Sequence, residues 1–509
     1  MVHFDPDLQS MQEMRDAVKA AKEAQAVFAE FTQKQVDDVV KAIADAAYSQ
    51  SEHLARLAHE ETGLGVAEHK KIKNEVGSKS VYESIKNEKT VGIISEDPKN
   101  GVTEVASPFG VVAGIVPVTN PTSTTMFKIL ISLKARNAIV ISPHPSAKNC
   151  CVETARICLE AAVKAGAPKG IIGWISKPTM DATQSLMKHS DVNVILATGG
   201  GGLVRAAYSS GKPAYGVGPG NVPVYIEKTA DVKLSVKRIT DSKTFDNGTI
   251  CASEQSVVAD RQIKEQVVKE FEKNGAYFLS GEEKRKMEAV ISPVPRTLNP
   301  KIVGKSAKVI AGMAGISVPD NTRLLIAYEN NVGKEYPFSI EKLAPVFAFY
   351  TVNDHEEAFS LCEKLLSLGG RGHSLALHTK DKELARRFAI KMPVSRLLVN
   401  TPSALGAVGG TTGLAPSLTL GCGTFGGNIT SDNVTVKHLF NKKRLAYGTR
   451  ELDIPQVKQA DSAPAKSAVT KEELEEIVKQ VISSMDDPKQ ADPQKIIQVV
   501  KETVSALQN

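Results

Sequence analysis

Short apolar runs rich in β-branched residues alternate with helix-like segments along most of the chain, and this alternation limits the choice of fold more than any other feature. The strand-like runs of the first half are Val111–Val116, Ala138–Ile141, Val192–Leu196 and Val222–Ile226. Helix-like segments lie between them, for example Thr124–Ala135 and Ala147–Ala165. Strands that alternate with helices are typical of parallel sheets with helices on both faces.

A second series of the same kind occupies the later half of the chain. Its strand-like runs are Ser256–Ala259, Arg323–Tyr328, Val346–Thr351, Ser374–His378 and Arg396–Asn400. Its helix-like segments are Gln262–Asn274, His355–Leu366 and Lys382–Ile390. The sequence therefore predicts an α/β fold with two doubly wound domains.

Two other segments precede and interrupt the first series. Residues 7–61 are rich in Ala, Lys, Glu and Gln, which predicts helices with Val27, Phe28 and Phe31 on one apolar stripe. Further on, Val91–Ile94 and Val102–Ala106 flank an Asn-Gly pair, the pattern of a β-hairpin.

Composition places the chain among ordinary globular proteins. Of its 509 residues 42% are hydrophobic and 24% charged, and the net charge is only +6. No apolar run reaches the roughly 18–20 residues of a membrane span, and the first residues do not resemble a signal peptide. The six cysteines lack metal-type spacing and the basic residues are scattered. We therefore expect a cytoplasmic location, free thiols, and neither metal, membrane nor nucleic acid as partner.

The composition changes again after Pro455. Residues 455–469 predict a flexible linker, and Thr470 with Glu473 forms the pattern of a capping box. Two amphipathic helices should follow, the second from Pro493. Their apolar stripes are Leu474, Ile477, Val478, Val481, Ile482 and Met485 in the first, and Ile496, Ile497, Val500, Val504 and Leu507 in the second. Such stripes need cover from each other, from the rest of the chain or from a partner.

Cys251 is the first candidate for chemistry. It lies in the segment FDNGTICASEQ, where Asn247-Gly248 allows a tight turn that could expose the thiol. Cysteine is a good nucleophile as a thiolate, but a free cysteine is more commonly a buried structural residue.

Three further features carry polar groups of catalytic types. Asn120, in PVTNP, follows a predicted strand, where it could donate to an oxyanion or simply cap the next helix. Ile195–Val204 runs from a strand into four glycines, an arrangement that lets phosphate approach a helix N-terminus. His373, just before a predicted strand, could move a proton near neutral pH, although lone histidines are more often structural.

These segments together resemble the CoA-acylating aldehyde dehydrogenases, including the aldehyde dehydrogenase half of bifunctional aldehyde–alcohol dehydrogenases. The resemblance covers about residues 5–450. It implies that Cys251 is the nucleophile, Asn120 the oxyanion donor and His373 an acid–base group. It also implies that NAD is bound by Thr119, Ser142, Pro143, His144, Thr198, Gly199, Gly200, Gly218 and Glu341, with coenzyme A as co-substrate.

Two more stretches are similar to the same family. Glu61–Asn74 (ETGLGVAEHKKIKN) matches a run that we interpret as structural. Ser417–Asn428 matches a glycine-rich segment at the active-site mouth; its Cys422 lacks the FDN context of Cys251 and is the weaker candidate nucleophile.

A missing residue bears on the mechanism. Hydrolytic members of the wider family carry a glutamate that activates water, in a segment that corresponds to Tyr215–Asn221 here. No Asp or Glu occurs between Asp191 and Glu227, so we expect the acyl-enzyme to wait for the thiol of CoA. Ser142-Pro143-His144 lacks the Lys and Glu that hold the adenosine ribose in hydrolytic relatives, which leaves the choice between NAD and NADP open.

The resemblance also implies a domain plan. It assigns 1–88 and 107–227 to a dinucleotide-binding domain, 228–428 to a catalytic domain, and 89–106 with 429–454 (including a strand at Asn433–Phe440) to an oligomerisation arm of a homodimer or homotetramer. Residues 470–509 resemble the tails that bring some relatives into bacterial microcompartments through shell proteins. The alternative is that they pack on the enzyme or between its subunits.

The expected substrate is acetaldehyde or propionaldehyde, oxidised reversibly. Three alternatives stay open: an anionic aldehyde such as succinic semialdehyde or sulfoacetaldehyde, hydrolysis to the free acid, and a catalytically silent scaffold. An anionic aldehyde would need a fixed cation near Cys251.

Overall fold

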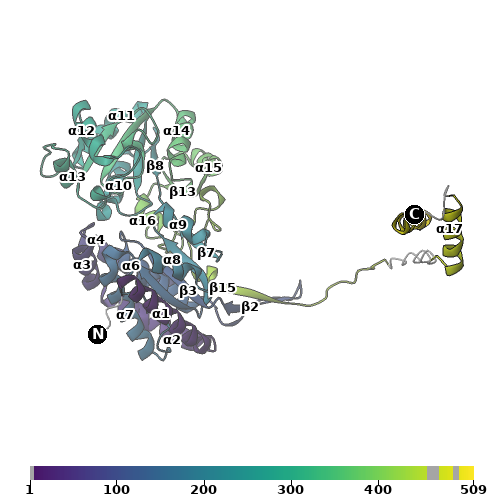
Figure 1. Ribbon diagram of the computed structural model, residues 1–509. Helices are drawn as coiled ribbons and strands as arrows, with labels where there is room; N and C mark the ends of the chain where they lie inside the picture. The colour runs from purple at the N-terminus through teal and green to yellow at the C-terminus, as the bar shows by residue number, and fades with distance from the viewer. Residues whose placement is uncertain (1–4, 456–468, 485–491, 509) are drawn as a thin grey trace. The chain divides into compact units, whose positions relative to one another are not determined.

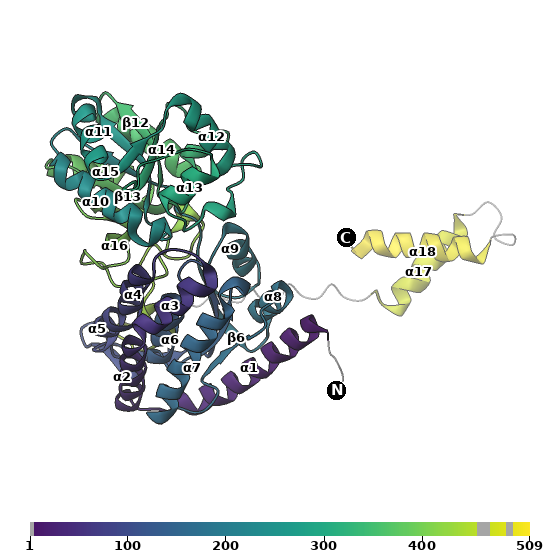
Figure 2. The same cartoon turned by 90° about the vertical axis from the view of Figure 1, so that its left-hand side faces the viewer.

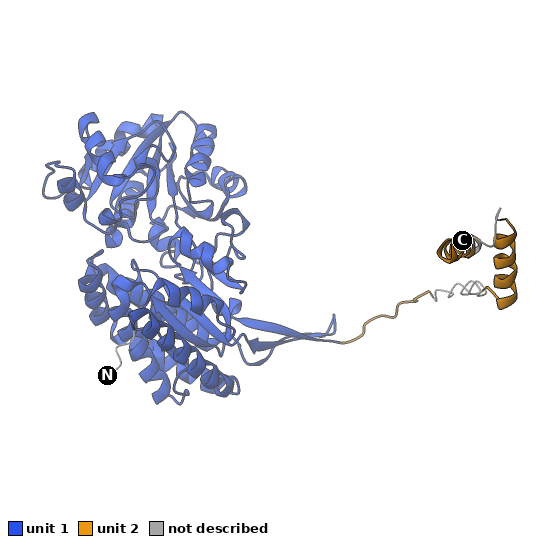
Figure 3. Cartoon of the chain, in the orientation of Figure 1, with its two compact units in different colours: residues 1–446 blue, residues 447–509 orange. Residues whose placement is uncertain are grey.

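The chain divides into two compact units, residues 1–446 and 447–509 (Figure 3). The computed structural model describes residues 5–455, 469–484 and 492–508. Within this part of the chain, every helix is too short or too polar to span a lipid bilayer.

A five-stranded parallel sheet forms the first lobe of the larger unit, in the order β5-β4-β3-β6-β7. Its strands are β3 (Val111–Val116), β4 (Ala138–Pro143), β5 (Ile172–Trp174), β6 (Val192–Thr198) and β7 (Ala214–Val217). The helices that pack on it are α1 (Pro6–Phe28), α6 (Pro121–Lys134), α7 (Lys148–Lys164), α8 (Met180–Lys188) and α9 (Gly201–Tyr208). All residues of β3 are buried, because helices cover both faces of the sheet.

A seven-stranded parallel sheet forms the second lobe, in the order β10-β11-β12-β9-β8-β13-β14, and Figures 1 and 2 show the two lobes one above the other. Its strands are β8 (Val222–Ile226), β9 (Glu254–Asp260), β10 (Ala276–Phe278), β11 (Leu324–Tyr328), β12 (Val346–Val352), β13 (Gly372–His378) and β14 (Val394–Val399). Its helices are α10 (Val232–Thr244), α11 (Lys264–Lys273), α12 (Gly281–Ile291), α13 (Ala307–Met313), α14 (His355–Ser367), α15 (Lys382–Lys391) and α16 (Ser403–Ala407).

Alternate side chains of this second sheet enter two different cores. Val224 and Val257 pack with α10 and α11 on one face. Tyr225 and Val258 pack with α12, α13 and α14 on the other. This period of two is what a doubly wound sheet requires, and the α/β fold predicted from the alternating pattern is confirmed.

A three-stranded antiparallel sheet projects from the first lobe (Figure 1). It consists of β1 (Gly92–Asp97), β2 (Val102–Pro108) and β15 (Phe440–Ala446), with β2 in the middle. The turn between β1 and β2 contains Gly101 at φ 62°, as the Asn-Gly pair predicts.

Four shorter helices complete the N-terminal part: α2 (Gln33–Ser49), α3 (Ser51–Thr62), α4 (Ala67–Glu75) and α5 (Val81–Ile85). A capping box of Thr32 and Gln35 begins α2, and Gly63, with φ 63°, ends α3. One predicted core residue is wrong: Phe28 is buried, but Val27 is 56% exposed, because consecutive helical residues point about 100° apart.

Three predictions about boundaries need correction. The strand Val222–Ile226 was expected in the first domain, which was placed at 107–227, but it pairs with β9 and β13 of the second sheet. No continuous strand runs over Asn433–Phe440: Val434, Val436 and Leu439 enter the core of the first lobe, and the strand of the arm begins at Phe440. His373 is the second residue of β13 and not a residue that precedes the strand.

The smaller unit contains α17 (Lys471–Ser483) and α18 (Pro493–Gln508), which pack against each other. The predicted capping box is present, since the Thr470 hydroxyl accepts from the Glu473 N–H and the Glu473 carboxylate accepts from the Thr470 N–H. Val481 is buried, whereas Leu474 and Ile497 are 41% and 55% exposed. Met485 and the side chain of Leu507, both predicted in the stripes, lie outside the described residues. The two helices cover only part of each other's apolar surface.

Candidate active site

A cavity of about 440 Å³ lies where the carboxyl edge of the first sheet meets the amino edge of the second. The segments that follow β3, β4 and β6 line one side, and those that precede β8, β9 and β12 line the other. Crevices at the carboxyl ends of parallel strands are where α/β proteins bind ligands. The cavity is lined by Cys251 and Asn120 and by every residue predicted to bind cofactor: Thr119, Ser142, Pro143, His144, Thr198, Gly199, Gly200, Gly218 and Glu341.

A tight turn before β9 presents Cys251. Asp246, Asn247 and Gly248 have φ values of 50°, 53° and 76°, three consecutive residues in the left-handed region. Asp, Asn and Gly are the residues that adopt this region most readily, so the FDNG segment matches the turn. The turn leaves Cys251 half-buried, whereas the other five cysteines are buried.

His373 lies against the thiol. Its Nε2 is 3.2 Å from Cys251 Sγ, and its Nδ1 is 3.1 Å from Ser374 Oγ. Burial, reinforced by Glu341, raises the pKa of Cys251 to about 12, and burial, reinforced by Arg396, lowers the pKa of His373 to about 3. The resting pair is therefore a neutral thiol and a neutral imidazole.

Asn120 precedes α6 but does not cap it, since its side chain makes no hydrogen bond to the first turn of that helix. Instead, Oδ1 accepts from Lys73 Nζ at 2.6 Å. Nδ2 donates to Thr119 Oγ1 at 3.2 Å and to the Thr249 carbonyl, two residues before Cys251, at 3.4 Å. The amide thus lies beside the cysteine turn, as an oxyanion donor must.

The glycine loop and Glu341 suit a dinucleotide. β6 runs into Gly200, which immediately precedes α9, and a Cβ added at Gly200, Gly201 or Gly202 would meet no backbone, so a phosphate can approach the N–H groups of the helix start. The Glu341 carboxylate accepts from the Gly220 N–H at 2.8 Å, and burial raises its pKa to about 7. A carboxylate at the cavity wall can accept from a ribose hydroxyl.

The sequence matches the Aldehyde dehydrogenase family over residues 5–428, more than half of the chain. The chain belongs to the aldehyde dehydrogenase family.

Individual relatives agree with this assignment. The bifunctional aldehyde-alcohol dehydrogenase AdhE of Escherichia coli K12 is 49% identical over 439 residues, which are 85% of this chain and 49% of that protein. The chain spans about half the length of the first curated relatives that it matches. The crystal structure of an acetylating aldehyde dehydrogenase from Geobacillus thermoglucosidasius superposes with a TM-score of 0.88 and 56% identity, covering 89% of this chain and 100% of that one.

A third relative comes from a microcompartment. It is a propionaldehyde dehydrogenase from the fucose utilisation bacterial microcompartment of Clostridium phytofermentans, with a TM-score of 0.77 and 31% identity over 86% of this chain and 97% of that one. The fold of this chain is therefore the aldehyde dehydrogenase fold.

In this aldehyde dehydrogenase the cavity wall carries little charge. Among the lining residues in the described part of the chain, Glu341 is the only carboxylate, and none is Lys or Arg. Ser142 Oγ is 2.8 Å from Thr183 Oγ1, and the His144 ring accepts from the Ser146 N–H, so both polar side chains of the Ser142–His144 segment already have protein partners.

Sequence reasoning missed two groups at this site. Arg396 is buried and donates to the His373 carbonyl at 3.1 Å and to Ser374 Oγ at 3.3 Å, which fixes the start of β13. Lys70 and Lys73 of α4 are 2% and 5% exposed and both bind the Asp246 carboxylate. The signal for the lysines was present in the Glu61–Asn74 motif, in which Lys70 and Lys73 lie about one helical turn apart.

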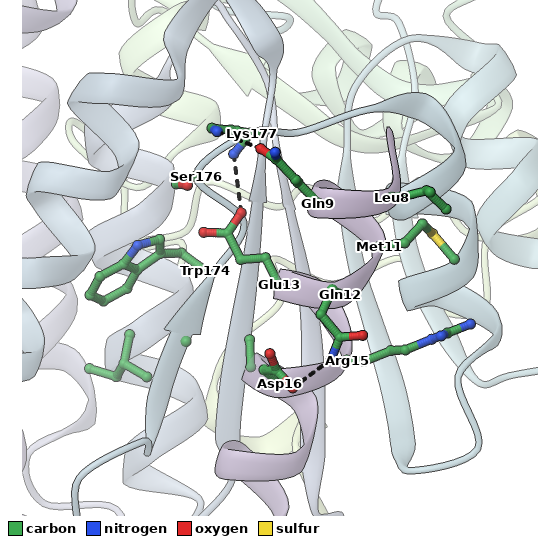
Figure 4. A pocket seen from close by; sticks show the side chains of 13 residues that line it. Leu8, Gln9, Met11, Gln12, Glu13, Arg15, Asp16, Trp174, Ser176 and Lys177 are labelled. Atoms are coloured by element: carbon green, nitrogen blue, oxygen red, sulfur yellow. Dashed lines mark hydrogen bonds between the residues drawn. The ribbon is translucent and has the colours of Figure 1, made fainter. Parts of the chain in front are cut away.

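A hollow larger than the cavity at Cys251 lies elsewhere in the described structure. It has about 1070 Å³ and is lined by α1 and by residues around β5, including Arg15, Trp174 and Lys177 (Figure 4). Several of its polar groups pair with one another: Lys177 donates its N–H to Glu13 and its ammonium to Gln9, and the Gln12 amide donates to Asp16. No cysteine or histidine is among the residues that line it, so the chemistry belongs to the cavity at Cys251.

Proposed function

We propose that this aldehyde dehydrogenase is a CoA-acylating enzyme that oxidises a short, uncharged aldehyde to acyl-CoA with NAD. The observation that carries the proposal is the pairing of Cys251 with His373 beside a cavity in which the segment Tyr215–Asn221, the place of the water-activating glutamate in hydrolytic members, has no carboxylate. Glu341, the one cavity carboxylate in the described chain, already accepts from the Gly220 N–H.

The first step is attack of sulfur on the aldehyde. As the bond from Cys251 Sγ to the carbonyl carbon forms, the thiol proton passes to Nε2 of His373. The aldehyde oxygen gains negative charge and is held by Nδ2 of Asn120 and the backbone N–H of Cys251. Because the imidazole is a weak base here, proton transfer must accompany bond formation and not precede it.

The second step oxidises the thiohemiacetal on Cys251. NAD, when bound, supplies the acceptor for the hydride that leaves carbon. The oxyanion collapses to the carbonyl, so Asn120 releases it and Cys251 now carries a thioester. His373 then releases the first proton to solvent. The thiol of CoA attacks the thioester carbon, and His373 takes the CoA proton and passes it to the sulfur of Cys251, which leaves as the product acyl-CoA forms.

The charge of the cavity supports an uncharged aldehyde. A carboxylate or sulfonate on the substrate would need a cation, and neither Lys nor Arg lines the cavity within the described chain. The buried cations beside the site are already occupied. Arg396 donates to the carbonyls of His373 and Gly421 and to two side chains, and Lys73 donates to Asn120, Thr249 and Asp246. The same lack of cations favours NAD over NADP, whose extra phosphate would also need one.

We propose two further assignments from the arm and the tail. The arm presents exposed apolar residues, Ile93 and Leu445, on β1 and β15, which supports a homodimer or homotetramer built through this sheet. The exposed Leu474 and Ile497 of the tail support binding of microcompartment shell proteins through residues 470–509, and hence a location inside a microcompartment of the cytoplasm.

The proposed reaction is tested by NADH formation from propionaldehyde and NAD, with and without CoA. We expect steady turnover only with CoA, and at most one NADH per subunit without it. A Cys251→Ala variant is the control and should give neither. Steady turnover at the same rate without CoA would mean that water completes the cycle and would overturn the acylating assignment.

A further inference from the structure

We infer that Lys73 is a positioning residue for the oxyanion site: it locks the side-chain amide of Asn120 so that Nδ2 faces the Cys251 turn. The inference rests on the proposed function, because it assigns Lys73 a role in the same reaction. Its basis is a buried network that joins α4 of the first lobe to the turn before β9 in the second.

The Lys73 ammonium has three N–H groups and three acceptors. They are Asn120 Oδ1 at 2.6 Å, Thr249 Oγ1 at 2.9 Å and a carboxylate oxygen of Asp246. The Thr249 hydroxyl donates its own proton to Asp246, at 2.7 Å from Oδ2, and can therefore accept from the lysine. Every donor of Lys73 is used, so the ammonium has one fixed position.

This arrangement decides which way the Asn120 amide points. An ammonium can only donate, so the amide must turn its oxygen toward Lys73. Nδ2 is then directed to the opposite side, where its acceptors are Thr119 Oγ1 at 3.2 Å and the Thr249 carbonyl at 3.4 Å. Both contacts are long for N–H···O bonds, so an anionic oxygen on Cys251 would be a better acceptor than either.

Asp246 keeps the lysine in place. Its side chain is fully buried and accepts from the Val66 N–H at 2.7 Å as well as from Lys70, Lys73 and Thr249. Burial alone would raise the pKa of Asp246, but Lys73 and Lys70 overcome this effect and hold the pKa below its ordinary value. Because Asp246 belongs to the turn that presents Cys251, the same carboxylate ties the nucleophile to the cation behind the amide.

Lys70 provides a matched comparison. It is as deeply buried as Lys73, lies one helical turn before it, and also binds the Asp246 carboxylate, at 3.1 Å. Its other partner is the Thr119 carbonyl at 3.2 Å, and no hydrogen bond joins it to the Asn120 side chain. Removing either lysine leaves Asp246 with one cation, but only loss of Lys73 releases the amide.

The test is a double-mutant cycle of Lys73→Met and Asn120→Ala, with Lys70→Met as control. The quantity measured is the rate of the first NADH turnover from propionaldehyde without CoA. We expect Asn120→Ala to slow it by about 10²-fold or more, as loss of one oxyanion donor does. Lys73→Met should slow it by about tenfold or more in the wild-type background and hardly at all in the Asn120→Ala background.

Two further measurements distinguish the loss of Asn120 orientation from a general disruption of the site. Alkylation of Cys251 by iodoacetamide needs no oxyanion donor and follows the thiolate fraction, on which the Lys73 charge also acts. Its rate is therefore measured in every variant, and the first-turnover rates are compared after division by it. Lys70→Met leaves the hydrogen bond from Lys73 to the Asn120 amide in place, so it should slow the first turnover much less than Lys73→Met does. If Lys73→Met does not fold, Lys73→Gln takes its place in the cycle.

The outcomes are distinct. Equal losses in Lys70→Met and Lys73→Met, or a Lys73→Met loss that persists in the Asn120→Ala background, would overturn the inference and leave the proposed reaction standing. A wild-type first-turnover rate in Asn120→Ala would overturn both the oxyanion role of Asn120 and the role of Lys73. Absence of NADH from the wild-type protein would contradict the proposed function itself.

Discussion

At Cys251, burial keeps the proton on sulfur. The half-buried cysteine has lost part of the water that would stabilise a thiolate, and the nearby Glu341 carboxylate opposes a second negative charge. His373 cannot compensate as a preformed imidazolium, because its own burial and Arg396 disfavour the charged ring. In the free enzyme Cys251 should therefore be a thiol that reacts slowly. It becomes an effective nucleophile only when the carbonyl carbon of the substrate lies beside it.

This charge state predicts the pH dependence of alkylation. Below the raised pKa of Cys251, the thiolate fraction grows about tenfold with each pH unit, so the rate of modification by iodoacetamide should rise steadily from pH 7 to pH 9. Mass spectrometry of the Cys251 peptide measures it, with Cys251→Ser as the unlabelled control. A plateau that begins below pH 8 would mean that the thiolate is already formed near neutral pH.

At the scale of elements, the turn before β9 depends on a residue without a side chain. Gly248 has φ 76°, and a Cβ at this position would lie 3.1 Å from the Ala344 N and 3.2 Å from its carbonyl. Ala344 precedes β12, so the turn and the start of that strand are in close contact. A methyl group would press the two segments apart and shift Cys251 from His373.

Gly248→Ala should therefore lower both stability and activity. The left-handed conformation alone costs about 1–2 kcal/mol in an alanine, and the backbone contact adds to this. Gly211→Ala is the control, because Gly211 has φ 80° but no atom within 4 Å of the added Cβ. Calorimetric melting temperatures and turnover rates measure the effects. Equal losses in the two variants would show that the contact with Ala344 contributes nothing.

The elements also show which parts of the fold the sequence could predict. Val111–Val116 was predicted to the residue, because a fully apolar β-branched run between turns has few other structures available. β5, β7 and β10 were missed, since three or four residues contain too little periodicity to recognise. In Asn433–Phe440, Val434 and Val436 alternate as in a strand, yet packing against the first lobe imposes a 3-10 turn.

The residues of the site also include some that the sequence could predict and some that it could not. Cys251 and Asn120 stand beside recognisable strands, but their roles, and Glu341 as a candidate, came from the family resemblance. The structure brings all three residues to one cavity. Lys73 was missed because α4 is rich in charged residues, a composition typical of an exposed helix. The burial of Lys73 is favourable only because it pairs with Asp246, which is distant in the sequence. The partner of β8 could not be predicted either, because an apolar run does not specify which sheet it joins.

At the scale of the whole molecule, the catalytic and tail units have separate stabilising contacts. The sheets, the cavity and the Asp246 network all belong to residues 1–446. α17 and α18 pack on each other within residues 447–509. If the tail serves only to bind shell proteins, its removal should change neither the reaction at Cys251 nor the oligomer formed through the arm.

Truncation after Pro455 should therefore leave turnover of propionaldehyde with CoA unchanged within about twofold. The truncated protein should also sediment as the same dimer or tetramer as the full chain, and should no longer co-purify with shell proteins. Leu474→Asp in the full-length chain is the matched control and should weaken co-purification alone. Loss of turnover or a shift to monomer on truncation would assign the tail a structural role.

The position of the cavity has a consequence for how the enzyme is made. Asn120 and Lys73 come from the first lobe and Cys251 and His373 from the second, so neither lobe holds a working site by itself. During refolding, secondary structure and the two cores can form while the protein is still inert. Recovery of activity should then lag behind recovery of helical signal, and the length of that lag would time the docking of one lobe onto the other.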